Sequence, residues 1–213
     1  MKHYLNLEAI TDLQSAIDEV IDLKKNPYAA QDLGRQKTLG MLFFNPSLRT
    51  RLSTQKAAQN LGLKTMIMNF SDEAWALEFE DGTKMNGLRS EHIKEAAAVV
   101  SQYCDIVAIR AFASLSNKEK DEEEQVLKCF ARYSSIPVIN MESATAHPLQ
   151  ALADAVTIKE QLFTKKPKIV LTWAPHPRAL PHAVGNSFTK MVQKLDAEFV
   201  ITQPKGYELN PKI

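Results

Sequence analysis

Short apolar runs alternate along the chain with longer segments whose apolar residues recur every three or four positions. The runs are rich in Val, Ile, Leu, Met and Phe and are bounded by turn residues, which is typical of buried parallel strands. The longer segments have the spacing of amphipathic helices that cover a sheet. Strands are predicted at residues 37–44, 64–70, 105–112, 137–141, 168–173 and 198–202, and helices at 11–25, 47–60, 91–103, 116–133, 149–163 and 180–195.

This order of elements predicts an α/β fold. A strand followed by a helix and another strand forms a parallel βαβ unit, and the pattern repeats along the chain. A chain of 213 residues is long enough for two modest domains. We therefore predict two parallel-sheet α/β domains, the first at residues 1–144 and the second at 145–213. The second has too few predicted strands to close a domain of its own.

A long polar loop at residues 71–90 interrupts the alternation. Loops of this length in compact domains are usually functional or mobile. Trp75 is unusual within it. A tryptophan here either packs on its own domain or reaches a ligand or a neighbouring subunit.

The start of the predicted helix at 47–60 has the features of an anion site. The first backbone N–H groups of a helix have no partner within it and lie at the positive end of its dipole. Ser47 and Thr50 add hydroxyl groups, and Arg49 and Arg51 add guanidinium groups that can fork onto phosphate oxygens. A phosphate or a phosphate-like group is the predicted ligand. An ordinary serine-capped helix with two surface arginines fits the same stretch.

Three further polar residues stand at strand and helix ends. Arg110 falls in an apolar strand, where an unpaired charge is costly, so it is expected to face a partner at the carboxyl end of the sheet. That partner is either a ligand or a structural ion-pair partner. His147 and Gln150 flank the first turn of the helix at 149–163. A histidine there either caps or packs the helix, or donates a hydrogen bond to a reacting oxygen.

Charge and cysteine content narrow the function classes. With 26 basic and 25 acidic residues, the chain has no electrostatic footprint for nucleic acid or an anionic membrane. Cys104 and Cys129 form no C-x-x-C pair, so neither a disulfide framework nor a zinc site is expected. The amino terminus lacks the apolar block of a signal peptide, and no segment reads as membrane-spanning. We expect a cytoplasmic protein without a metal.

Together these motifs resemble a known family. Ser-Leu-Arg-Thr-Arg at 47–51, then Arg110, then His-Pro-Leu-Gln at 147–150 is similar to the carbamoyl-phosphate signature of the aspartate/ornithine carbamoyltransferase superfamily. Trp75 and the segments 172–178 and 183–187 resemble its N-acylornithine branch, and most closely the N-succinylornithine enzymes. The resemblance extends over essentially the whole chain.

The resemblance implies an activity. These enzymes transfer a carbamoyl group from carbamoyl phosphate to the δ-amine of an N-acetyl- or N-succinyl-L-ornithine, giving N-acylcitrulline and phosphate in arginine biosynthesis. No cofactor, metal or covalent intermediate is implied. The family's carbamoyl-phosphate residues correspond here to Ser47, Leu48, Arg49, Thr50, Trp75, Arg110, His147, Pro148, Leu149 and Gln150.

The resemblance also assigns roles to individual residues. Arg110 and His147 would polarise the carbonyl oxygen, and Gln150 would orient the carbamoyl amide. Glu142 and His176 match positions that contact the acylornithine. A homotrimer is implied, with Trp75 crossing to a neighbouring subunit.

Two departures from the family pattern bear on function. Family members continue into an H-C-L-P loop, further basic substrate-binding residues and a final helix, which are absent here, so the second domain is expected to be truncated. Ser90 lies where the acylornithine branch typically has Glu or Pro, which leaves acetyl and succinyl preference open. A plain ornithine carbamoyltransferase is one alternative. A non-catalytic remnant that binds carbamoyl phosphate or forms the trimer is the other.

Overall fold

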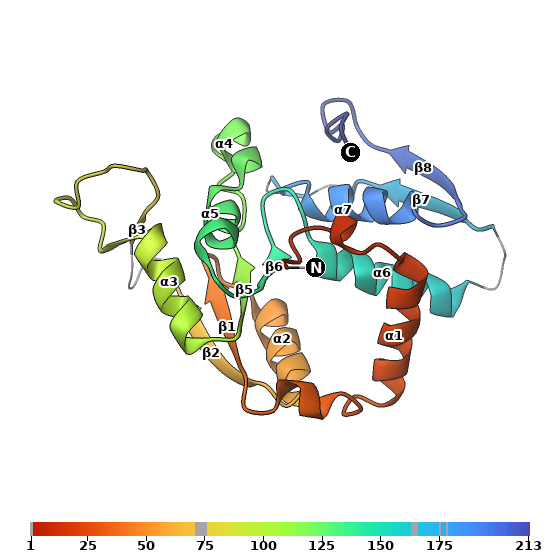
Figure 1. The fold of residues 1–213 in the computed structure, drawn as a ribbon. Helices are drawn as coiled ribbons and strands as arrows, with labels where there is room; N and C mark the ends of the chain where they lie inside the picture. Colours follow the sequence, from red (N-terminus) through yellow and green to blue (C-terminus); the bar gives the residue numbers. More distant parts are fainter. Residues whose placement is uncertain (1, 71–75, 163–165, 175, 178) are drawn as a thin grey trace.

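The computed structural model describes residues 2–70, 76–162, 166–174, 176–177 and 179–213. Within them, a parallel sheet has four strands in the order β2-β1-β5-β6 (Figure 1). A separate parallel pair, β7-β8, follows later in the chain. The predicted α/β fold with parallel sheets is confirmed. The strands are β1 (Thr38–Phe43), β2 (Lys64–Asn69), β5 (Ile106–Arg110), β6 (Val138–Glu142), β7 (Lys168–Thr172) and β8 (Glu198–Thr202).

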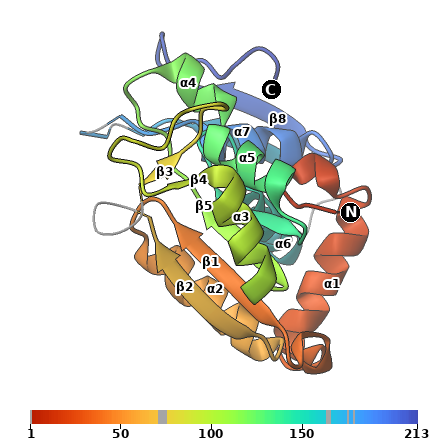
Figure 2. The same ribbon diagram turned by 60° about the vertical axis from the view of Figure 1, so that its left-hand side comes forward.

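The first sheet is covered on both faces, which explains its continuous apolar runs. Helix α2 (Leu48–Asn60) lies on one face, and α3 (Ile93–Tyr103) and α5 (Gln125–Tyr133) lie on the other, as Figure 2 shows. Leu42 packs with the α3 and α5 core, whereas its neighbour Phe43 packs with the core on the α2 side. Successive strand residues thus point to opposite buried faces.

A second group of elements surrounds α6 (Pro148–Gln161). Helix α7 (Ala183–Val192) connects β7 to β8, which gives the second βαβ unit that the sequence predicts. The amino-terminal helix α1 (Leu13–Lys25) packs against α6 as well, and its residue Ile17 shares a buried core with Ala155 and Met191. Helix α1 is therefore joined to the later part of the chain (Figure 1).

The prediction of a single helix at 116–133 is wrong. The chain forms α4 (Lys118–Glu123) and α5, and these are separated by Glu124 in the left-handed conformation, with φ 50° and ψ 44°. The Glu124 carboxylate accepts hydrogen bonds from the turn that follows β6. These bonds favour the left-handed backbone of Glu124 over a continuous helix. No glycine marks this break in the sequence.

A small parallel pair of strands has one member inside the loop predicted at 71–90 and the other immediately after it. These are β3 (Leu77–Glu78) and β4 (Glu91–His92), and Leu77 is 3% exposed because it packs in the α3 core. Strand β3 is therefore anchored to the helices that cover the first sheet.

The amino-terminal segment covers the free edge of β6. The Tyr4 N–H donates to the Val138 carbonyl at 2.8 Å, and the Tyr4 carbonyl accepts from the Asn140 N–H at 2.8 Å. Two 3-10 helices, η1 (Leu7–Ala9) and η2 (Gln31–Gly34), flank α1 on either side. An otherwise open sheet edge is thus protected by the chain's own first residues.

Candidate active site

A cavity of about 750 Å³ opens at the carboxyl ends of β1, β5 and β6. The last residues of these strands lie side by side, since Phe43 pairs with Arg110 and Arg110 pairs with Glu142. Open α/β sheets bind ligands at this end of their strands. The cavity is lined by Ser47, Arg49, Thr50, Ser53, Thr54, Arg110, Met141, Glu142, His147, Leu149, Gln150, Ala153, Asp154 and Val184.

The amino terminus of α2 forms one wall of the cavity. Ser47 is the helix cap: its hydroxyl accepts from the Thr50 N–H at 3.3 Å and donates to Thr50 Oγ1 at 2.9 Å. Arg49 is exposed, and within the described residues its side chain has neither a hydrogen bond nor an ion pair. Arg51 differs, because it donates to Asn69 Oδ1 at 2.6 Å and lies 4.6 Å from the centre of the Phe43 ring. Of these two arginines, Arg49 is the one whose side chain is available to an anion.

Arg110 and Glu142 form a buried ion pair at the floor of the cavity. The distance from Arg110 Nη2 to Glu142 Oε2 is 2.9 Å, and both side chains are 11% exposed. A shift of register between Ile109 and Arg110 places Arg110 opposite Glu142. Such a β-bulge re-aims a side chain at the end of a strand. The ion pair that the sequence left as an alternative is therefore present, and it lies on the cavity wall.

The Arg110 guanidinium also links the end of β6 to a turn of another element. Its Nη1 donates to the Pro46 carbonyl at 3.3 Å, in the turn that leads into α2. Its Nε is buried without a hydrogen-bond partner among the described residues. The group thus reaches both sides of the cavity.

His147 precedes α6 and faces the same ion pair. Its Nε2 lies 3.8 Å from Glu142 Oε2, and its backbone N–H donates to Ser187 Oγ at 2.8 Å. Burial lowers the pKa of His147 below its ordinary value and Arg110 adds to this effect, whereas Glu142 and Asp154 act in the opposite direction. A neutral imidazole at neutral pH follows, which can donate a hydrogen bond without carrying charge.

Asp154 is a cavity residue that the sequence analysis missed. Its Oδ1 accepts from Gln150 Nε2 at 2.8 Å, one helical turn away. The amide oxygen of Gln150 is thereby left for a donor in the cavity. Burial raises the pKa of Asp154, and the hydrogen bond from Gln150 opposes the increase. The spacing of four residues on a predicted helix was the signal that could have identified this pair.

The remaining predicted site residues are placed as follows. Leu149 lines the cavity, whereas Pro148 is the buried first residue of α6. Leu48 is exposed at the first position of α2. His176 is exposed and does not line the cavity, and Trp75 lies outside the described residues. The roles assigned to these residues stay predictions.

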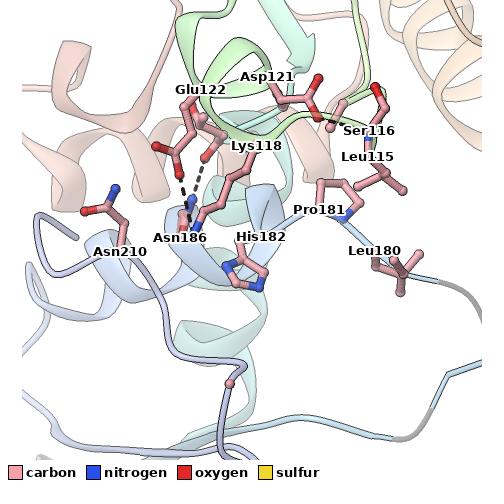
Figure 3. A pocket seen from close by; sticks show the side chains of 15 residues that line it. Leu115, Ser116, Lys118, Asp121, Glu122, Leu180, Pro181, His182, Asn186 and Asn210 are labelled. Atoms are coloured by element: carbon pink, nitrogen blue, oxygen red, sulfur yellow. Dashed lines mark hydrogen bonds and ion pairs between the residues drawn. The ribbon is translucent and has the colours of Figure 1, made fainter.

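A second hollow of about 450 Å³ lies on the other side of the 144–145 turn, between α4 and the segment before α7 (Figure 3). Asn186 lines it and donates from Nδ2 to the Thr145 carbonyl at 3.0 Å. Lys118 and Glu122 form an ion pair at 3.9 Å on its α4 side. The turn that leads to His147 therefore borders this hollow, and the residues at its two ends, Glu142 and His147, line the main cavity.

Comparison with known proteins identifies the family. Residues 2–160 match the family described as aspartate/ornithine carbamoyltransferase, carbamoyl-P binding domain. The chain belongs to the aspartate/ornithine carbamoyltransferase family. The resemblance that the motifs indicated is thus confirmed. In this carbamoyltransferase-family chain, residues from each of the motifs line one cavity.

Relatives of this carbamoyltransferase-family chain include N-acylornithine enzymes. N-succinylornithine carbamoyltransferase of Bacteroides fragilis (strain 638R) is 50% identical over 212 residues, which is 100% of this chain and 67% of the relative. N-acetylornithine carbamoyltransferase of Xanthomonas campestris pv. campestris is 38% identical over 209 residues, 96% of this chain and 61% of the relative. Acetylornithine transcarbamylase complexed with acetylcitrulline has a TM-score of 0.92 at 36% identity, covering 100% of this chain and 64% of the solved one. This chain spans about two thirds of the length of these relatives.

In the described part of the chain, no cluster of three or more His, Cys, Asp or Glu side chains is arranged to hold a metal ion. Among the same residues, no helix combines the length and the apolar character needed to cross a bilayer.

Proposed function

We propose that this chain binds carbamoyl phosphate in the 750 Å³ cavity and belongs to an enzyme that transfers the carbamoyl group to the δ-amine of an N-acyl-L-ornithine. One observation carries the proposal. One cavity joins the amino terminus of α2 to the buried Arg110–Glu142 pair and to the start of α6, where His147 and Gln150 lie. We call Ser47, Arg49 and Thr50 the phosphate half, and Arg110, Glu142, His147 and Gln150 the carbonyl half.

The phosphate half suits a doubly charged group that arrives from solvent. The amino-terminal N–H groups of α2 and its dipole attract an anion, and the exposed Arg49 can fork onto two phosphate oxygens. The Ser47 and Thr50 hydroxyls already contact each other at 2.9 Å, so their positions are set before the ligand arrives. Binding at this half needs little rearrangement of the protein.

The carbonyl half suits the other end of carbamoyl phosphate. Arg110 and the neutral His147 can donate to the carbonyl oxygen, and the Gln150 amide oxygen can accept from the carbamoyl NH₂ group. The amine attacks the carbonyl carbon, a C–N bond forms, and negative charge collects on the carbonyl oxygen. The C–O bond to phosphate then breaks, phosphate leaves with the electron pair, and the amine loses a proton. Preorganised donors to such an oxyanion each contribute roughly 3 to 4 kcal/mol.

The acceptor amine is proposed to be that of an N-acylornithine. The two relatives described above, at 50% and 38% identity, carry N-succinylornithine and N-acetylornithine in their names, whereas an ornithine carbamoyltransferase of Prochlorococcus marinus (strain MIT 9312) is 36% identical over 197 residues. A solved N-acetyl-L-ornithine transcarbamylase mutant is complexed with carbamyl phosphate and N-succinyl-L-norvaline. Glu142 and His176 are the residues proposed to contact the acylornithine.

Further features of the resemblance belong to the same proposal. They are a role in arginine biosynthesis, a homotrimer in the cytoplasm, Trp75 crossing between subunits, and the division into residues 1–144 and 145–213. Analytical ultracentrifugation tests the trimer, because a monomer at micromolar concentration would contradict it.

Calorimetry with carbamoyl phosphate, together with a citrulline-release assay, tests the proposal. We expect saturable binding, and turnover with N-succinyl- or N-acetyl-ornithine but not with free ornithine. Turnover with free ornithine alone would assign the chain to the plain ornithine enzymes. Binding without turnover would assign it a carbamoyl-phosphate-binding role only, and absence of binding would refute the cavity assignment.

A further inference from the structure

The turn at residues 143–146 joins Glu142 at the end of β6 to His147 at the start of α6. It contains none of the residues proposed to touch the ligand. The Ser143 N–H donates to the Ala146 carbonyl at 2.8 Å, and Asn140 Nδ2 donates to Ser143 Oγ at 2.9 Å. The positions of Glu142 and His147 relative to each other depend on this turn, because it is the only covalent link between them.

Glu124 reaches this turn from the junction of α4 and α5. One of its oxygens, Oε1, accepts from the Thr145 N–H at 2.9 Å and from Thr145 Oγ1 at 2.7 Å. The Ser143 hydroxyl donates to the same oxygen. Hydrogen bonds to a carboxylate are shorter and stronger than those between neutral groups. The turn is therefore held by one side chain of another element.

The backbone of Glu124 shows that these bonds are maintained against a local cost. Its φ of 50° lies in the left-handed region, which residues other than Gly, Asn and Asp rarely adopt. Strained residues of this kind persist only where the surroundings fix them. Here the three donors from the turn supply that fixation.

Side chains of helix α7 also hold the same turn. Asn186, which is 6% exposed, donates to the Thr145 carbonyl at 3.0 Å, and Ser187 Oγ accepts from the His147 N–H at 2.8 Å. Figure 3 shows Asn186 directed from α7 toward α4, the helix that precedes Glu124. The turn is thus held by α7 as well as by the α4–α5 junction.

We propose that Glu124 is a positioning residue that clamps the 143–146 turn and so keeps Glu142 and His147 opposite Arg110. Glu124 does not line the main cavity and acts through the turn alone. The clamp does not contact α2, so the phosphate half is independent of it. The choice of carbamoyl phosphate as the probe rests on the proposed function, whereas the clamp itself rests only on these contacts.

The decisive variant is Glu124→Gly, compared by calorimetry with carbamoyl phosphate and with inorganic phosphate. Glycine adopts the left-handed conformation without strain, so a residue that serves only its own backbone would be replaced without loss. We expect affinity for carbamoyl phosphate to fall about tenfold, the equivalent of one misplaced hydrogen bond, while affinity for inorganic phosphate stays unchanged. Glu124→Gln, which keeps an acceptor oxygen, should recover most of the loss.

Two further variants control the measurement. Glu123→Ala removes a neighbouring exposed carboxylate that has no contact with the turn and should leave both affinities unchanged. Thr145→Val removes one donor to Glu124, and combining it with Glu124→Gly should add no further loss, because both changes break the same contact. The clamp would be overturned if Glu124→Gly kept the wild-type ratio of affinities for carbamoyl phosphate and inorganic phosphate. Fully additive losses in the double variant of Glu124→Gly and Thr145→Val would overturn it as well.

Titration of the His147 ring by NMR separates failure of the clamp from failure of the proposed function. The charged groups that face His147 are Glu142, Arg110 and Asp154. Loosening of the turn admits water, so the pKa of His147 should rise toward its ordinary value in Glu124→Gly and return in Glu124→Gln. If the wild type binds neither ligand, the proposed function fails, and the titration still decides: an unchanged pKa in Glu124→Gly overturns the clamp.

Discussion

The two halves of the cavity differ in how far their polar groups are already paired. In the phosphate half, Arg49 is exposed and has no ion pair within the described residues. In the carbonyl half, Arg110 is paired with Glu142 at 2.9 Å, and Gln150 is bonded to Asp154 at 2.8 Å. The phosphate half thus has a charged side chain available for an anion, whereas the charged and amide side chains of the carbonyl half are already paired.

This difference follows from what each half is proposed to bind. A phosphate group carries its charge throughout, so the exposed Arg49 can meet it directly from solvent. The oxyanion exists only in the transition state, so the donors that stabilise it must be in place beforehand. Arg110, which is buried and held by its ion pair with Glu142, meets that requirement.

The largest predicted effect is on stability, from breaking the pair in the carbonyl half. Arg110→Met leaves the Glu142 carboxylate buried without its partner, and the free energy of unfolding should fall by about 3 to 5 kcal/mol. Urea denaturation measures the change. Arg110→Met combined with Glu142→Leu should recover most of the loss. A loss of under about 1 kcal/mol in the single variant would mean that water reaches the pair.

The next effect is on catalysis. His147→Ala should lower the rate of citrulline release by about 10²- to 10³-fold, because one donor to the developing oxyanion is lost. Affinity for carbamoyl phosphate should change much less. The reverse pattern, with affinity lost and turnover kept, would assign His147 to the binding of the ground state.

In the phosphate half, the expected effect is on affinity alone. Arg49→Ala should weaken carbamoyl phosphate binding at least about hundredfold by calorimetry, because a forked, charge-assisted contact is removed. Arg51→Ala is the matched control. Arg51 is bonded to Asn69 at 2.6 Å, so its loss should change affinity by less than about threefold. Equal losses in the two variants would refute the assignment of Arg49.

A smaller effect is expected at Asp154, which orients Gln150. The asparagine in Asp154→Asn can donate to the Gln150 amide oxygen, so the amide can flip and no longer present that oxygen to the cavity. Affinity for carbamoyl phosphate should then fall by up to about tenfold. Glu160→Gln, at the far end of α6, is the control and should have no effect. If affinity for inorganic phosphate fell by the same factor in Asp154→Asn, the change would have disturbed the whole cavity.

The smallest effect concerns pH. Because the pKa of His147 is lowered in the folded state, the unfolded chain takes up a proton first as pH falls below about 6.5, and the free energy of unfolding decreases. The pKa values of His3 and His182 are also lowered and add to the same slope. The difference between wild type and His147→Gln isolates the contribution of His147. A steeper slope in the variant would contradict a neutral buried imidazole.

The sequence predicted the first sheet and the capped start of α2 well because both are local patterns. Strand β1 is buried on both faces, so it appears as one apolar run, and Ser47 begins α2 as a typical cap. The shared cavity of Arg110, His147 and Gln150 could be expected only because the carboxyl ends of parallel strands meet at one edge. Their roles in catalysis stay predictions.

What the sequence did not reveal depends on tertiary contacts. The break at Glu124 has no glycine or proline to mark it and follows from bonds to a turn that lies about twenty residues further along the chain. Strands β3 and β4 have two residues each, too few to show any periodicity. The bulge before Arg110, which pairs it with Glu142, depends on the register of two strands and leaves no local signal.

The covering of β6 by the amino-terminal segment also has a consequence for how the chain folds. His3 Nδ1 accepts from the Val138 N–H across 135 positions of sequence, so this edge can close only after β6 has been synthesised. Contacts of such long range are slow to form, because a large loop must close first. Until the amino-terminal segment docks, the outer edge of β6 is unpaired and can pair with another copy of the chain. Shortening the first few residues should therefore affect the yield of folded protein during refolding more than the cavity itself.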